Sequence, residues 1–196
     1  MKSRSTIAAL LLSPTLLSAQ HRPAAPPPVR SAPVEARQFA FLIGQWELVV
    51  KPQAVGLGQR IHGVPRLLGT WKAWRALDGW GITDELRITD ESGNPRELAH
   101  AVRLYDATTR RWNVSRADVN RSTFQASTGE WKDGKMTMTS METDASGKPF
   151  MSRTRYSDIT PTSFRFQQEH SFDQGAKWTQ TLSIEAKRVA AVAPRE

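Results

Sequence analysis

The stretch Trp178-Thr179-Gln180-Thr181-Leu182-Ser183-Ile184-Glu185-Ala186 places its larger, mostly apolar side chains at every second position, with small polar or charged ones between them. A period of two is typical of a β-strand that packs one face inward and exposes the other to water. The preceding segment, 164–172, repeats the pattern, with three phenylalanines on one face. The sequence therefore predicts two adjacent strands at the end of the chain.

Similar segments, nine or ten in number, follow one another between Gln45 and Lys187, and short turn signals such as Asp78-Gly79 and Asp133-Gly134 separate them. Strands joined by short turns pair with their neighbours, which gives an antiparallel meander. Closing a meander removes its edges. We therefore expect an all-β fold, an antiparallel up-and-down meander closed into a β-barrel of about 9–10 strands. The stretch 34–42 favours a short helix that could plug one mouth.

The sequence of the N-terminal region predicts an export signal followed by a spacer. Lys2 and Arg4 precede an apolar run and the small residues Ser18-Ala19, the order found in secretory signal peptides. We expect a signal peptide over 1–19, a Pro-rich disordered linker over 20–34, the barrel domain over 35–188 and a flexible tail over 189–196. The expected location is periplasmic or extracellular, with a retained N-terminal anchor as the alternative, and no transmembrane segment is expected after cleavage.

The chain contains no cysteine, which excludes disulfides, thiolate metal sites and a catalytic thiol. An exported chain without disulfides fits a bacterial envelope protein better than a secreted animal protein. The four histidines, at 21, 62, 100 and 170, are too scattered for a metal motif, so no metal or cofactor is expected. A haem held by His170 alone is the alternative for a cofactor.

The formal net charge of +8 could attract an acidic partner, or it could simply reflect a basic, soluble surface. The sequence contains no run of five or more lysines and arginines and no nucleic-acid-binding motif, so we expect no specific nucleic-acid partner.

Gly44-x-Trp46, which follows the expected helix, resembles the start of calycin, or lipocalin-like, barrels. In that superfamily the tryptophan plugs the closed end, and an arginine near the end of the last strand covers it; Arg188 matches that position. Leu77-Asp78-Gly79-Trp80, together with the pair Tyr105-Asp106 and Arg111-Trp112, is similar to small secreted bacterial domains of unknown function in the same group. The resemblance implies a fold and a cavity, with Gly44, Trp46 and Arg188 closing the barrel, and no particular activity.

Polar residues that interrupt apolar inward rows are the candidates for function, because burying them unpaired costs free energy. We predict that a cavity is lined by such residues together with two aromatic neighbours: Trp80, Asp84, His100, Phe166, Gln168, His170 and Gln180. His100 shares a face with Leu98, Val102 and Leu104, but the pattern allows either face of this segment to point inward. A satisfied buried polar network is the competing interpretation.

Three functional hypotheses follow. The first is an exported module that binds a small apolar or amphipathic molecule in the barrel. The second is an enzyme of the same architecture that uses an Asp/His acid–base pair; no nucleophile motif accompanies it, so no catalytic residue is assigned. The third is a non-catalytic interaction domain of the cell envelope, with a filled core. An open cavity would support the first hypothesis against the third.

Overall fold

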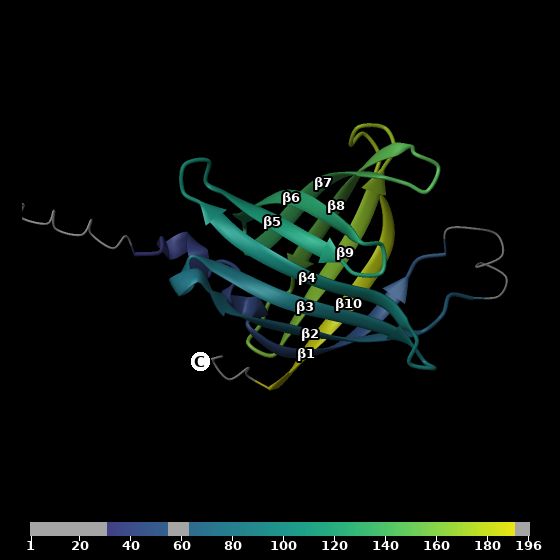
Figure 1. Ribbon diagram of the computed structural model, residues 1–196, viewed down its shortest axis with the longest axis horizontal. Helices are drawn as coiled ribbons and strands as arrows, with labels where there is room; N and C mark the ends of the chain where they lie inside the picture. Colours follow the sequence, from purple (N-terminus) through teal and green to yellow (C-terminus); the bar gives the residue numbers. More distant parts are fainter. Residues whose placement is uncertain (1–30, 55–62, 191–196) are drawn as a thin grey trace, which may run out of the picture. The chain divides into compact units, whose positions relative to one another are not determined.

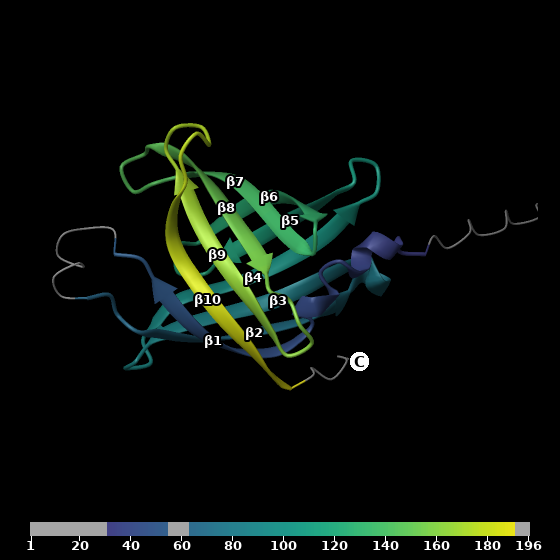
Figure 2. The same ribbon diagram turned by 180° about the vertical axis from the view of Figure 1, so that it is seen from behind.

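The computed structural model describes residues 31–54 and 63–190, and within these ranges ten antiparallel strands form a closed barrel (Figure 1 and Figure 2). The strands are β1 (Gly44–Pro52), β2 (Leu67–Ala76), β3 (Gly81–Asp90), β4 (Pro95–Asp106), β5 (Arg111–Asp118), β6 (Thr123–Lys132), β7 (Lys135–Thr143), β8 (Pro149–Ser157), β9 (Ser163–Ser171) and β10 (Thr179–Ala190). Each strand pairs with the next in sequence, and β10 pairs with β1 to close the barrel. The predicted meander barrel is confirmed.

The predicted signal peptide (1–19) and most of the predicted linker (20–34) lie outside the described residues, as does the tail beyond Ala190. β10 itself continues to Ala190, two residues past the expected end of the barrel domain. In the part of the chain that the structure describes, no helix has the length and apolar character needed to cross a membrane.

The expected N-terminal helix is present as two short 3-10 turns, η1 (Val34–Arg37) and η2 (Ala40–Leu42). The buried side chains of this segment are Ala36 in η1, Phe39 between the two turns and Leu42 in η2, which recur every third residue. A 3-10 helix has three residues per turn, so this spacing places all three side chains on one face, whereas an α-helix would rotate them apart. That face packs into the core at one end of the barrel.

The end of the barrel opposite the 3-10 turns carries hairpin turns that are organised by aspartates. Asp90 Oδ1 accepts hydrogen bonds from the backbone N–H groups of Ser92 and Asn94, both at 3.0 Å. Asp144 Oδ1 repeats the arrangement with Ser146 and Lys148, both at 2.9 Å. The side chains of Asn94 and Ser146 also bond Asp90 and Asp144, respectively, and they contribute most to lowering the pKa of these two aspartates. The backbone bonds act in the same direction, because all of them stabilise the ionised carboxylate.

The lowered pKa values predict that the turns weaken in acid. A carboxyl group whose pKa is lower in the folded than in the unfolded chain contributes stability above its ordinary pKa of 3.8, and that contribution is lost as the pH falls through the folded value. Asp144→Asn keeps an acceptor oxygen but cannot titrate, so its melting temperature should fall less than that of the wild type between neutral and strongly acidic pH. Asp133→Asn, at a turn where no hydrogen bond to the carboxylate is found among the described residues, is the control and should follow the wild type. Equal acid sensitivity in the wild type and both variants would contradict the prediction.

β10 departs from the regular alternation that the sequence predicts. The register with β9 shifts between Gln180 and Leu182: Gln180 pairs with Glu169, and Leu182 pairs with Gln168. This bulge turns the residues before it to the opposite face. Gln180 consequently accepts a hydrogen bond from Gln167 Nε2, at 3.2 Å, on the outer face, while Leu182 and Ile184 face inward.

Candidate functional site

The closed end of the barrel is filled by aromatic side chains. Trp46 is fully buried, its Nε1 donates to the carbonyl of Leu42 at 2.7 Å, and Phe164 packs edge-on against it with ring centroids 4.7 Å apart. Phe39, from the segment between η1 and η2, packs edge-on against Trp112 at 4.8 Å. These side chains fill the closed end, so the open space inside the barrel lies toward its other end.

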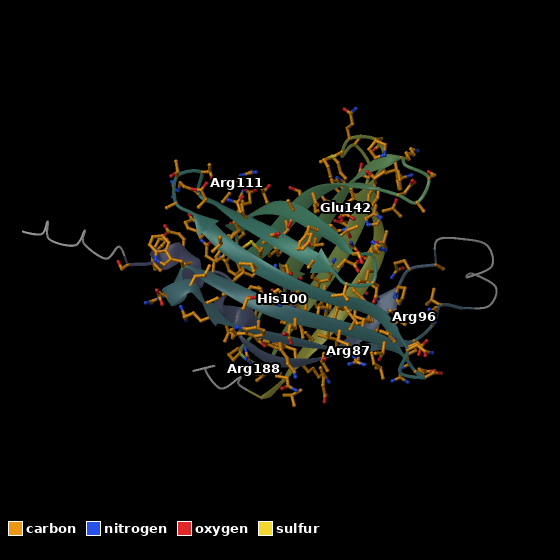
Figure 3. All side chains as sticks on the ribbon, viewed as in Figure 1. Arg87, Arg96, His100, Arg111, Glu142 and Arg188 are labelled. Atoms are coloured by element: carbon orange, nitrogen blue, oxygen red, sulfur yellow. The ribbon has the colours of Figure 1, made fainter. Side chains whose placement is uncertain are left out.

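Arg188, from the end of β10, covers this aromatic cluster from outside. Its guanidinium carbon lies 4.1 Å from the Trp46 ring centroid, a cation–π contact. The same guanidinium donates to the carbonyl of Phe41 at 3.0 Å and also to that of Ile43. Arg188 therefore ties the last strand to the backbone of the N-terminal plug, and Figure 3 shows it toward that end of the barrel, with Arg96 and Glu142 toward the other.

A buried ion pair lies between the aromatic end and the cavity. Asp84 Oδ2 accepts from Arg103 Nε at 2.7 Å, and Asp84 Oδ1 accepts from Trp71 Nε1 at 2.7 Å. Burial alone would lower the pKa of Arg103, but the adjacent Asp84 carboxylate outweighs it and holds that pKa above its ordinary value. Burial raises the pKa of the neighbouring Tyr156 phenol, so this group stays neutral. Both oxygens of Asp84 are thus satisfied by the protein itself.

Beyond the ion pair the barrel contains a cavity of about 1040 Å³, lined by residues of β2 to β10. Its apolar walls include Ile88, Val114 and Leu182, and its polar walls include Ser152 and Gln168. Phe124 and Met141, which also line it, are 83% and 67% exposed, so the cavity opens to solvent. The predicted cavity is therefore present, with a more polar lining than the inward phenylalanines of β9 suggest.

Every arginine on the cavity wall has an acidic partner. Besides the pair of Arg103 with Asp84, Arg116 bonds Glu97, Arg121 lies 3.8 Å from Asp118, and Arg96 lies 2.9 Å from Asp90. Glu142, which accepts a hydrogen bond from Ser140 at 2.9 Å, is in no ion pair within the described residues. Each arginine of the lining therefore has an acidic neighbour, whereas Lys148, whose Nζ lies 5.0 Å from the ring centroid of the lining residue Phe172, is in no ion pair among the described residues.

Among the described residues, only one buried side-chain nitrogen or oxygen has no hydrogen-bond partner. This atom is Nε2 of His170. The imidazole lies against Phe150, with ring centroids 4.5 Å apart, and it lines the cavity. Burial lowers its pKa below the ordinary value of 6.5, although Glu142 acts in the opposite direction. The ring is therefore neutral at pH 7, and its Nε2 is enclosed by protein atoms and does not face the cavity.

Four of the seven predicted cavity residues line this cavity: Asp84, Phe166, Gln168 and His170. The other three do not. Gln180 faces outward because of the β10 bulge, and Trp80 caps the 3-10 turn η3 (Leu77–Gly79), away from the cavity lining. His100 is exposed on the outer face of β4, where its Nε2 lies 3.0 Å from Thr83 Oγ1 (Figure 3).

The placement of His100 follows from which face of β4 points inward. The sequence suggests the row with Leu98, Val102 and Leu104, which is the more hydrophobic one. In the structure the opposite row is inside: Glu97, Ala99, Ala101, Arg103 and Tyr105. The two small alanines leave room for the cavity, and Arg103 is buried because Asp84 pairs with it. Arg103 and Glu97 were therefore missed, although the small alternating alanines could have indicated that face.

An acid–base pair of Asp84 and His170 is not assembled. Asp84 accepts a hydrogen bond from Trp71, whose ring lies 5.9 Å from that of Phe166 between centroids. Asp84 and Phe166 are therefore at a similar level along the barrel axis. His170 is four residues further along β9, about 13 Å toward the open end at a rise of about 3.3 Å per residue. No group of three or more potential metal ligands occurs in ranges 31–54 and 63–190.

No family model matches the sequence, and no curated protein does. Among solved structures, "Structure of a redesigned beta barrel, mFAP0, bound to DFHBI" is 9% identical, with a TM-score of 0.41, covering 76% of this chain and 99% of that one. "Structure of EF1p2_mFAP2b bound to DFHBI" is 10% identical, with a TM-score of 0.40, covering 79% and 98%. These two barrels indicate nothing about what this chain binds.

Proposed function

We propose that this protein is an exported, lipocalin-like binding protein of the bacterial envelope that holds a small amphipathic molecule in its barrel. The observation that carries the proposal is the open cavity of about 1040 Å³ beyond the Asp84–Arg103 pair. Cavities that bind small molecules have about 300–1,000 Å³ and combine apolar walls with a few polar groups. Export is supported by the charged and apolar order of residues 1–19.

The two kinds of wall fit an amphipathic ligand. Ile88, Leu182 and Phe166 offer apolar contacts, whereas Ser152, Gln168 and His170 on β8 and β9 offer hydrogen bonds. Exposed Phe124 and Met141 at the rim provide an apolar entrance for the ligand. A non-catalytic envelope domain with a filled core would not contain such a cavity.

The proposal predicts that the cavity binds N-phenyl-1-naphthylamine, an uncharged dye whose emission rises in apolar surroundings. Ser127→Trp places an indole in the cavity from β6 and should weaken dye binding by more than about tenfold, measured by fluorescence titration. Ser115→Trp, on the exposed face of the neighbouring strand β5, is the matched control and should bind like the wild type. Failure of the wild type to bind the dye, or equal binding by Ser127→Trp, would refute the proposal.

A further inference from the structure

The antiparallel ladder between β6 and β7 stops short of the open end of the barrel. It pairs residues 128–132 with residues 135–139 and is the shortest of the ten ladders. The rest of β6, residues 123–127, pairs only with β5, and the rest of β7, residues 140–143, pairs only with β8. Figure 1 shows the two strands diverging in this direction. The barrel wall therefore has a slit between 123–127 and 140–143, here called the β6–β7 slit.

The lining of the cavity follows the slit. On β8, which is paired on both sides, only every second residue lines the cavity, namely Phe150, Ser152, Thr154 and Tyr156. At the slit, by contrast, every residue of 123–127 and of 140–143 lines it. Successive residues of a strand point to opposite faces of the sheet, so side chains of both faces border one space only where that space passes between the strands. The cavity therefore opens sideways through the slit.

No side-chain hydrogen bond or ion pair of the described residues crosses the slit. Gln125 accepts from Arg116 of β5 at 3.2 Å, and Glu142 accepts from Ser140 of its own strand at 2.9 Å. The residues along the slit are exposed or half-buried, so water can satisfy the backbone groups that lack a neighbouring strand. The two edges can therefore move apart without breaking a bond between them.

The outer edges of the slit are apolar. Phe124 on β6 and Met141 on β7 flank it, and both side chains are largely exposed. Exposed apolar groups beside an opening give an apolar molecule a first contact with the protein. From the interrupted ladder, the lining on both faces and these apolar flanks, we infer that the ligand enters and leaves the barrel sideways, between β6 and β7. The inference rests on the proposed binding function.

A disulfide across the slit tests this route. The chain has no cysteine, and continuing the register of β6 with β7 would place Ala126 opposite Met141. In oxidised Ala126→Cys/Met141→Cys, association and dissociation of N-phenyl-1-naphthylamine should both slow by more than about tenfold relative to the reduced form, measured by stopped-flow fluorescence. The affinity should stay within about twofold, because closing a route raises the barrier without changing the bound or the free state.

Two control variants separate the slit from general effects. Asn113→Cys/Thr128→Cys forms a crosslink between paired, exposed positions of β5 and β6, and its oxidised and reduced forms should exchange dye at equal rates. Ala126→Trp needs no crosslink, and its indole at the edge of the slit should slow exchange by more than about twofold relative to Ser115→Trp. Ser115 is the partner of Ala126 on β5, so this pair of variants differs only in distance from the slit.

The outcomes distinguish the route from the binding function. If the disulfide forms, as shown by mass spectrometry, but the rates stay unchanged or only the affinity changes, the sideways route is refuted while binding stands. If the disulfide does not form, equal exchange rates in Ala126→Trp and Ser115→Trp refute the route. If the wild type binds no dye, the proposed function fails, and the route fails with it.

Discussion

Arg103→Met should destabilise the barrel by about 3–5 kcal/mol, because it leaves the Asp84 carboxylate buried without its cation. The two side chains are only 6% and 3% exposed, and their 2.7 Å contact is the most deeply buried ion pair among the described residues. Trp71 Nε1 would still donate to Asp84, but one neutral hydrogen bond does not replace a guanidinium. Urea unfolding at neutral pH, followed by tryptophan fluorescence, measures the change in the free energy of unfolding.

Two further variants separate the ion pair from a general effect of losing an arginine. Arg111→Met removes an exposed arginine that lies 3.8 Å from Glu130, and it should change stability by less than about 1 kcal/mol. The double variant Asp84→Leu/Arg103→Met removes both charges, and it should recover much of the loss because no unpaired carboxylate remains. A loss of less than about 1 kcal/mol in Arg103→Met, or a double variant no more stable than the single one, would contradict this account.

Trp46→Ala should cost about 3–5 kcal/mol, since it opens a space in the middle of the closed end. Trp46 is fully buried, packs against Phe164, donates to Leu42 and lies under Arg188. The substitution thus weakens the core and also the attachment of the N-terminal plug to the last strand. The same urea unfolding experiment provides the measurement.

Trp178→Ala is the matched control for the closed end. Trp178 stacks on Arg153, with 3.9 Å from the guanidinium carbon to the ring centroid, on the outer face of the barrel, where its loss should cost about 1–2 kcal/mol. Arg188→Met should fall between the two, because it removes the cation and its carbonyl contacts and leaves the tryptophan in place. Equal losses for Trp46→Ala and Trp178→Ala would show that the closed end is not the main core of the barrel.

Local pattern was sufficient for the architecture. Alternation with a period of two and turns such as Asp133-Gly134 indicated nine or ten short strands in sequence, and the structure has ten, each of which pairs with its neighbour. The inward position of Phe166, Gln168 and His170 on β9 could be predicted for the same reason, since a regular strand points every second side chain to the same face. These features depend on residues close in sequence.

What only the tertiary structure decided involves residues from different strands. The bulge in β10 reversed the face of Gln180, and the inward face of β4 depended on Asp84, nineteen positions away from Arg103 in the sequence. Alternation defines two faces but does not say which is inside when both carry apolar side chains, as in β4. Whether the barrel is hollow depends on the summed volume of the inward side chains from all strands. Small inward residues such as Ala99 and Ala101 leave the cavity in which we place the ligand.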